Sequence, residues 1–441
     1  MQYLVIGLGL SGRAACELLL REKQQVIGVD RNISQEAVAS WYKNFTGSLQ
    51  LFNEHDEMDL GKIEKAILSP GISLENPFVQ KVLQNKIPVI GEAEFALSRI
   101  QRPCIGITGS NGKTTTTLFL AHLLTCAGLQ GKAIGNVGLP FSTYLLNSQP
   151  EDICVCELSS YQLETLKTPC LDFGVILEIT PDHMDRYKTF RDYAFAKFNM
   201  LRCLKPQAKA FVAYPTFQSF ESEITSLHPA VNSIPFMFCF QNKNSYLQLT
   251  KNKEYCDFLP LIKEKALGAE LIFLGAQLLE FFSLEKSILH EALQTFKKPE
   301  HRLEFVDVVK EIAFYNDSKA TNVESVLYAV KNLEKQIYLI VGGKDKQLCF
   351  DPWIEAFKHT VEHVFAIGEC AKKIQKTLEP TIKVDLCETL ETALRRAFHQ
   401  ATPRSKILLS PGCASFDQFK DYRHRGECFK NYVTALKKEV D

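Results

Sequence analysis

Short apolar runs alternate with amphipathic segments from one end of the chain to the other. The runs at 2–8, 24–30, 65–70 and 88–95 predict strands, because each is short and bounded by turn residues. The stretches between them have the length of a helix and an apolar period near 3.6 residues. This alternation is typical of parallel sheets with crossover helices, so it predicts an α/β fold.

The pattern restarts twice, which predicts three open α/β domains. A polar joint, SRIQRP, follows the first group of strands, so we expect the first domain at residues 1–98. Further groups of strands and helices predict a central domain at 99–298 and a C-terminal domain at 299–441. The later strands are expected at 104–108, 152–158, 173–180, 209–215, 303–317, 336–343, 363–369 and 406–412.

Composition and charge narrow the class of ligand. The 441 residues are 46% hydrophobic and 23% charged, which is typical of a globular protein with well-buried cores. Lysine plus arginine total 51, as do aspartate plus glutamate, so no overall field favours nucleic acid or an anionic membrane. We therefore expect small ligands, anion binding by local features only, and no obligate protein partner.

The chain begins directly with a predicted strand and a glycine turn, so we expect no export signal. It contains no apolar run long enough for a membrane helix. The 14 cysteines are scattered, and the closest pair, Cys154 and Cys156, alternates through a predicted buried strand. Buried thiols of this kind are usually reduced and inert, so we expect a cytoplasmic protein.

The segment GITGSNGKTTTT lies between a predicted strand and a predicted helix. It departs from the common phosphate-binding loop, because Ile107 stands where that pattern places its first glycine. Gly109 and Gly112 still allow the main chain to curl around an anion. Lys113 can reach the outer phosphates, and the Thr114 hydroxyl can contact Mg²⁺. The combination favours a phosphate site over a polar turn with a capping threonine.

Two other predicted strands of the central domain end in residues that suit a hard cation. Glu157 ends one strand, in VCELSSYQLE, and His183 follows another, in EITPDHMDR. Because ligands of a parallel sheet lie beyond the carboxyl ends of its strands, both should face the phosphate loop. Alone, each residue would be an ordinary solvated or core side chain, but their joint appearance after the loop favours a metal site.

Taken in order, several motifs resemble the Mur ligase family of ATP-dependent amide-forming enzymes. They are TGSNGKTTT, ELSSYQLE, ITPDHMDRY, the lysine of AFAKFN, HRLE and NDSKATN. GLGLSGRA near the start and LLSPGCASFDQF near the end resemble the members that add D-glutamate, and the resemblance spans nearly the whole chain. It implies a Rossmann-like N-terminal domain for a UDP-linked substrate, a central P-loop-type mononucleotide-binding ATPase domain, and a Rossmann-like C-terminal domain that binds the amino acid.

The resemblance implies ATP and, with it, two Mg²⁺ ions. ATP would be bound by Gly109, Ser110, Asn111, Gly112, Lys113, Thr114 and Thr115 of the loop, and by Arg302, Asp317 and Lys319 of the C-terminal domain. Thr114, Glu157, His183 and Lys197 would hold the metals, and Lys113, Glu157, His183 and Lys197 would be catalytic.

Lys197 needs a modification to serve as a metal ligand, because a cationic amine repels magnesium. The family carbamylates the matching lysine with carbon dioxide, so the resemblance implies a carbamate on Lys197. The residues alone allow a different interpretation, a solvent-facing lysine on the amphipathic helix at 189–201.

The resemblance also implies two substrates, UDP-N-acetylmuramoyl-L-alanine and D-glutamate. Thr321, Lys346 and Ser415 match positions that hold D-glutamate, and Tyr422 stands where phenylalanine is usual. The nucleotide-sugar side would be formed by Leu10, Ser11, Asp30, Arg31, Gly71 and Asn136.

Other functions stay open at this point. GLGLSG with Asp30 equally fits a dinucleotide site, which would indicate an NAD-dependent oxidoreductase. Another ligase of the same superfamily, including one that extends folate with glutamate, and a non-catalytic nucleotide-sugar-binding protein are further alternatives. The segment KEKALGAELIFLG lacks the asparagines that the family usually carries there for nucleotide contact.

Overall fold

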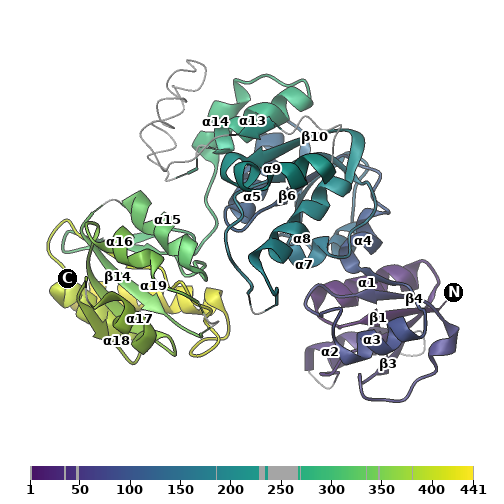
Figure 1. The fold of residues 1–441 in the computed structure, drawn as a ribbon, viewed down its shortest axis with the longest axis horizontal. Coiled ribbons are helices and arrows are strands. Elements are labelled where there is room, and N and C mark those ends of the chain that lie inside the picture. Colours follow the sequence, from purple (N-terminus) through teal and green to yellow (C-terminus); the bar gives the residue numbers. More distant parts are fainter. Residues whose placement is uncertain are drawn as a thin grey trace. The chain divides into compact units, whose positions relative to one another are not determined.

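The computed structural model describes residues 2–33, 36–45, 49–184, 186–227, 234–236, 267–268, 270–333, 335–345, 348–379 and 381–440. Within these residues the strands form three sheets, each with its own helices (Figure 1). The chain divides into two compact units. One comprises Met1–Ile179 and Arg191–Phe296, and the other comprises Thr180–Phe190 and Lys297–Asp441.

The first sheet is parallel, with the strand order β3-β2-β1-β4-β5. Its elements are β1 (Gln2–Ile6), α1 (Leu10–Arg21), β2 (Gln25–Val29), α2 (Glu36–Tyr42), β3 (Leu49–Phe52), β4 (Ile63–Leu68), α3 (Pro77–Gln84), β5 (Val89–Gly91) and α4 (Glu92–Leu97), with 3₁₀ turns at Lys43–Phe45 and Leu60–Lys62. Alternate residues of β1 enter two apolar clusters, one containing Phe78 of α3 and the other Leu19 of α1. The strand is therefore buried on both faces, as expected for a parallel sheet between helices.

The second sheet has the strand order β11-β10-β9-β6-β8-β7, also parallel. Its strands are β6 (Cys104–Thr108), β7 (Gln130–Gly135), β8 (Asp152–Glu157), β9 (Leu171–Ile176), β10 (Leu204–Ala213) and β11 (Ile234–Phe236). Its helices are α5 (Lys113–Cys126), α6 (Phe141–Leu146), α7 (Ser160–Leu163), α8 (Phe190–Arg202), α9 (Tyr214–Leu227), α13 (Glu270–Phe281) and α14 (Ile288–Thr295). β6 lies inside the sheet, so the loop that follows it opens at the centre of the carboxyl edge.

The third sheet has the strand order β12-β13-β17-β14-β15-β16. Its strands are β12 (Glu304–Val309), β13 (Ile312–Asn316), β14 (Ile337–Gly342), β15 (Val361–Ile367), β16 (Val384–Leu386) and β17 (Lys406–Leu409). Its helices are α15 (Val323–Leu333), α16 (Pro352–Phe357), α17 (Ala371–Leu378), α18 (Leu390–Gln400) and α19 (Tyr422–Val440). β12 pairs antiparallel with β13, and the other pairings are parallel. The predicted α/β class with three open domains is confirmed, whereas the domain boundaries stay predictions.

Some local predictions were wrong. The run at 88–95 is not one strand, because β5 ends at Gly91 and α4 begins at Glu92. The strands β3, β7, β11 and β16 were missed. Within the described residues, the structure contains no helix with the length and apolarity needed to cross a membrane.

A buried carboxylate joins the first sheet's last helix to the second sheet's domain. Glu92, at the start of α4, is buried, and its Oε1 accepts a hydrogen bond of 2.7 Å from the Ser142 N–H of α6. Its Oε2 is also buried and has no hydrogen-bond partner in the part of the chain that the structure describes. Burial raises the pKa of Glu92 from 4.5 to about 7, and the bonds from Ser142 only partly offset this rise.

This pKa predicts a pH-dependent stability. Glu92 is protonated in both states below its unfolded pKa of 4.5, and the folded state keeps the proton up to about pH 7. Glu92 therefore contributes most to the free energy of unfolding at low pH. Between pH 4.5 and about pH 7 this free energy falls by about 1.4 kcal/mol per pH unit. We expect Glu92→Gln to gain stability relative to wild type between pH 5 and 7.5, as measured by urea unfolding. The exposed Glu75→Gln is the control, and parallel pH profiles for Glu92→Gln and wild type would contradict the assignment.

Candidate active site

The phosphate loop is the turn between β6 and α5. Gly109 and Gly112 have φ of +143° and +81°, conformations that side-chain-bearing residues rarely adopt. A Cβ on Gly109 would lie 2.6 Å from the Leu177 Cβ, so the loop also packs too closely for a side chain there. Lys113 Nζ donates to the carbonyls of Gly109 and Ser110 at 2.8 and 2.7 Å. The sequence therefore builds a closed turn with its lysine folded across it.

The rest of the loop lies at the start of α5, where backbone N–H groups favour an anion. The Ser110 N–H donates to the Glu178 carbonyl at 2.9 Å, which ties the loop to the chain after β9. Asn111, Thr114 and Thr115 are half-buried in the loop and first helical turn. The residues predicted for phosphate are thus gathered in one turn, while nucleotide binding by them stays a prediction.

Glu157 is the last residue of β8, and it pairs in register with Ile107 beside the phosphate loop. It is 1% exposed. Its Oε1 accepts a hydrogen bond of 2.7 Å from Asn136 Nδ2, and its carbonyl accepts one of 3.0 Å from the Asn136 N–H. Its Oε2 is buried without a hydrogen-bond partner among the described residues. A buried anionic oxygen without a donor is costly, and it fits a magnesium ion.

Lys197 lies on α8 with its side chain 1% exposed, so the alternative of a solvent-facing lysine is wrong. Its Nζ is 4.6 Å from the centre of the Tyr193 ring, one helical turn earlier. The hydroxyls of Tyr193 and Ser110 lie 3.1 Å apart. Tyr193 therefore links the lysine to the phosphate loop. A carbamate on this buried lysine stays a prediction.

Tyr193 was missed by the sequence analysis. The signal was present, because Tyr193 and Lys197 are four residues apart and so share one face of a helix. Nothing in the pattern, however, distinguished this tyrosine from other apolar-face aromatic residues of α8.

His183 lies in the segment Thr180–Phe190, which packs with the C-terminal unit. Its backbone is left-handed, with φ of +56°, and its N–H donates to Asp182 Oδ1 at 2.8 Å. Its side chain is 35% exposed, with Nε2 3.9 Å from Asp182 Oδ2. The predicted convergence of His183 with Glu157 stays a prediction, because these residues belong to different units.

Asp317 follows β13 and is buried. Its two oxygens accept hydrogen bonds from the Leu303 N–H at 3.0 Å and from Ser410 Oγ at 2.8 Å. Burial raises its pKa to about 7, although these donors and the charge of Arg302 oppose the rise. Asp317 therefore holds together the loops before β12 and after β17, and a ribose contact for it stays a prediction.

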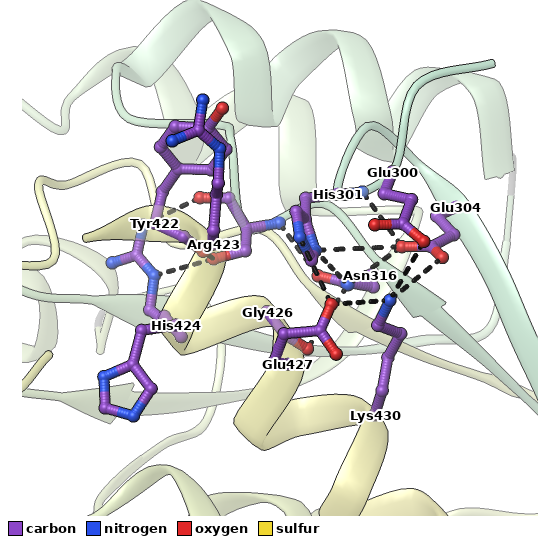
Figure 2. Close-up of polar contacts among 12 residues, drawn as sticks. Glu300, His301, Glu304, Asn316, Tyr422, Arg423, His424, Gly426, Glu427 and Lys430 are labelled. Atoms are coloured by element: carbon purple, nitrogen blue, oxygen red, sulfur yellow. Dashed lines mark hydrogen bonds and ion pairs between the residues drawn. The ribbon is translucent and has the colours of Figure 1, made fainter. Parts of the chain in front are cut away.

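His301, the residue before Arg302 in the sequence, lies in a polar network with Glu304 and Asn316 (Figure 2). Burial lowers the pKa of His301, and its Nδ1 accepts a hydrogen bond of 2.9 Å from Asn316 Nδ2. The His301 N–H and Asn316 Nδ2 both donate to Glu304 Oε2, at 2.9 and 3.0 Å. A Cβ on Gly426 would lie 2.2 Å from His301 Nδ1, so α19 can approach this closely only with a glycine there.

The acidic side of this network could suggest a second metal site, formed by Glu300, His301 and Glu427. Lys430 argues against it. Its ammonium lies 2.8 Å from Glu427 and 3.6 Å from both Glu300 and Glu304, so the carboxylates already have a positive partner (Figure 2). The network is therefore an ion-pair cluster that fixes the loop of Arg302 against α19.

A buried arginine connects two of the predicted ligand loops. Arg425 donates from Nη1 and Nη2 to the Cys413 carbonyl at 3.2 and 3.1 Å, and from Nη2 to the Ser318 carbonyl at 2.8 Å. Burial lowers its pKa to about 10, which leaves it charged at neutral pH. It thereby positions the loop of Ser415 beside the segment of Lys319, and the sequence analysis did not identify it.

The residues predicted for D-glutamate lie in these same loops. Thr321 is half-buried before α15, and Ser415 is buried. Tyr422 begins α19, and its ring lies 4.1 Å from Lys319 Nζ, so the tyrosine still presents an aromatic face to a cation. Lys346 lies outside the described residues. Residues 263–266 and 269 of the segment KEKALGAELIFLG, which lacks the family's usual asparagines, also lie outside them.

The residues predicted for the nucleotide sugar follow the carboxyl ends of neighbouring strands in the first sheet. Leu10 is exposed after β1, Gly71 is exposed after β4, and Ser11 is half-buried in α1. Asp30 follows β2 and accepts hydrogen bonds of 2.7 Å from the N–H groups of Leu8 and Asn32. The exposed Arg31 comes next, and Asn136 instead contacts Glu157 in the second sheet.

The fold and the site define an α/β protein with a short, glycine-containing loop of the phosphate-binding type on its central sheet. Three family models match the chain in order. The MurD-like N-terminal domain of Mur ligases matches residues 1–91, the Mur ligase middle domain residues 107–275, and the glutamate ligase domain residues 301–413. The chain belongs to the Mur ligase family.

Curated relatives named UDP-N-acetylmuramoylalanine–D-glutamate ligase match nearly the full length. The protein from Protochlamydia amoebophila is 38% identical over 98% of both chains. The one from Caldanaerobacter subterraneus is 35% identical over 98% of both, and the one from Chlamydia felis is 32% identical over 97% of this chain and 96% of the relative.

Solved structures show the same fold at low sequence identity. The UDP-N-acetylmuramate–alanine ligase from Thermotoga maritima is 14% identical, with a TM-score of 0.56 over 99% of this chain and 100% of that one. The MurF ligase from the same organism, solved with ADP, is 13% identical, with a TM-score of 0.56 over 86% of this chain and 98% of that one.

Two glycines at opposite ends of α5 offer a matched test of the phosphate loop. Gly112 has φ of +81°, and Gly128, just past the helix, has φ of +77°. We expect Gly112→Ala and Gly128→Ala each to lower the free energy of unfolding by about 1 kcal/mol, because both impose a left-handed alanine. Only Gly112→Ala should re-aim the loop N–H groups and raise the Kd for Mg-ATP, by about tenfold or more.

Calorimetric titration of both variants with Mg-ATP checks this prediction. No side chain or backbone lies within 4 Å of a Cβ placed on Gly128, so that variant carries the strain without a new contact. Equal ATP affinities for the two variants would show that the loop does not bind the phosphates.

Proposed function

We propose that the chain catalyses the ATP-dependent addition of D-glutamate to UDP-N-acetylmuramoyl-L-alanine in peptidoglycan precursor synthesis. The observation that carries this proposal is the 31–38% identity, over nearly full length, to curated relatives that bear this name. The phosphate loop, the buried Glu157 and the buried Lys197 supply chemistry that the reaction needs.

The reaction joins a carboxylate to an amine, so the carboxylate must first be activated. An oxygen of the L-alanine carboxylate attacks the γ-phosphorus of ATP, an acyl phosphate forms and ADP leaves. The amine of D-glutamate then attacks the acyl carbon, and after a tetrahedral intermediate the phosphate leaves and a proton is released. Each step brings negative oxygens together, so the site must supply fixed positive charge.

Residues of this chain supply part of that charge. The N-terminus of α5 and its loop amides receive the phosphates, and Lys113, which the loop carbonyls hold in place, neutralises the outer ones. Arg302 and Lys319 add charge from the C-terminal domain. Thr321, Lys346 and Ser415 orient D-glutamate, and Tyr422 forms an aromatic wall beside Lys319.

Magnesium, when bound, neutralises the γ-phosphate and the substrate carboxylate. Thr114 and Glu157 would hold one ion, with Asn136 keeping the second Glu157 oxygen in place. His183 and a carbamate on Lys197 would hold the other. Two observations support this arrangement: one Glu157 oxygen has no hydrogen-bond partner within the described ranges, and the amine of Lys197 is buried.

We place the reaction in the cytoplasm. The described cysteines are all free thiols, and most of them are buried. This usage fits a reducing compartment, in which small thiols keep cysteines unpaired.

An amino-acid panel tests the function directly. Purified full-length protein is incubated with Mg-ATP and UDP-N-acetylmuramoyl-L-alanine, and D-glutamate, L-glutamate or a diamino acid is added in turn. We expect D-glutamate alone to stimulate ADP release and to yield an amide product of the corresponding mass. Stimulation by another amino acid, or turnover of a nicotinamide cofactor in its place, would refute the proposal.

Lys197→Ala tests the proposed carbamate. We expect activity to fall by about a thousandfold or more and to recover partly with a short-chain carboxylic acid, which can replace the missing anion. Lys209→Ala is the matched control, because the Lys209 side chain, on β10, forms an exposed ion pair with Glu280 of α13. Unchanged turnover in Lys197→Ala would exclude the assigned role.

A further inference from the structure

Asp182 connects two segments that are far apart in the sequence. Its Oδ1 accepts the His183 N–H at 2.8 Å, and its Oδ2 accepts a hydrogen bond of 3.0 Å from Asn322 Nδ2. The two bonded side chains are separated by 140 residues. One carboxylate therefore holds the backbone of His183 and at the same time contacts the start of α15.

Asn322 is itself held in place by α15. Its Oδ1 accepts hydrogen bonds from the Ser325 N–H at 2.9 Å and from Ser325 Oγ at 2.7 Å. This is the pattern of a helix N-cap, and the side chain is buried. With its oxygen fixed by the cap, the amide has its nitrogen directed at Asp182.

The hydrogen bond between Asp182 and Asn322 bears on the backbone conformation of His183. Its left-handed backbone, with φ of +56°, is uncommon for a residue with a side chain and needs support from its surroundings. The Asp182 carboxylate supplies part of that support by accepting the His183 N–H, and the N–H groups of Arg186 and Tyr187 hold the His183 carbonyl. If Asn322 did not hold the other oxygen, the carboxylate would be freer to rotate away from this N–H.

We propose that the hydrogen bond between Asp182 and Asn322 positions His183 from the loop that carries Thr321. Asn322 follows Thr321, which we assign to D-glutamate binding, so the loop that binds the amino acid also anchors the histidine. Asp182 and Asn322 are positioning residues that act through His183. This inference rests on the proposed function, because it takes the metal role of His183 and the D-glutamate role of Thr321 from it.

Exchanging the two side chains tests the inference. Asn322→Asp keeps a good N-cap for α15 but places an anionic oxygen against Asp182, and Asp182→Asn removes the charge from the pair. The double variant, with asparagine at position 182 and aspartate at 322, restores one donor and one acceptor in reversed order. Asn332→Asp is the control, because Asn332 lies on the same helix and is exposed.

Two measurements on the full-length protein report the result. In the protein without metal or nucleotide, amide hydrogen exchange of the segment Thr180–Phe190 should be about tenfold faster in each single variant and return towards wild type in the double. Turnover with D-glutamate should fall by about a hundredfold in Asn322→Asp and recover at least tenfold in the double variant. The control should match wild type in both.

The outcomes separate this inference from the function on which it rests. If wild type forms product but the double variant recovers in neither measurement, the inference is wrong and the ligase function stands. Single variants that exchange and turn over like wild type would also overturn it. If wild type forms no product with any amino acid, the proposed function and the catalytic part of the inference both fail, whatever the exchange data show.

Discussion

The site depends on one constraint, the backbone of the turn between β6 and α5. The chain must leave a fully buried strand and enter a helix within four residues, and it does so through two glycines with positive φ. This turn exposes amide N–H groups at the centre of the carboxyl edge of a parallel sheet, which is where an anion is best stabilised. Lys113 closes the turn by donating to two loop carbonyls. The turn forms although Ile107 replaces the glycine that the common pattern has at this position.

Buried charge is the second feature that gives the site its chemistry. Glu157 and Lys197 are both almost fully buried, and neither would be retained there for stability alone. Asn136 donates to one oxygen of Glu157, and the other has no donor in the part of the chain that the structure describes. Tyr193 places Lys197 beside the loop. The buried polar residues of the C-terminal unit differ from Glu157. Asp317, His301 and Arg425 each form hydrogen bonds with other groups of the protein. Those residues fix loops, whereas Glu157 keeps an oxygen available for a ligand.

The sequence predicted the fold class and the loop because both depend on short-range patterns. Buried strands such as β1, β6 and β8 are continuous apolar runs, and the loop is a compact set of glycines, lysine and threonine. The edge strands β7 and β16 were missed because few of their side chains are buried, so they lack an apolar run. The hairpin at Lys310 and Glu311, where both residues have positive φ, carries neither glycine nor asparagine to announce it.

Long-range contacts could not be predicted from the pattern. Tyr193 and Lys197 share a helix face, but only the packed structure shows that this face is buried against Ser110. Asp182 and Asn322 are 140 residues apart in the sequence, and Arg425 joins the loops that follow β13 and β17. No local sequence signal indicates either contact. These residues contact the predicted site residues and hold them in place. Their residue types are common in any sequence, so only their position in the fold indicates this role.

We propose that the Glu157 oxygen without a hydrogen-bond partner among the described residues holds a divalent cation beside the phosphate loop. Anomalous diffraction from crystals grown with Mn²⁺ and a non-hydrolysable ATP analogue tests it most directly. The account predicts a manganese peak about 2.1 Å from Glu157 Oε2 or from a water bound to it, with the γ-phosphate on the other side. A nucleotide bound in the loop with no metal peak near Glu157, or a nucleotide bound elsewhere, would contradict the account.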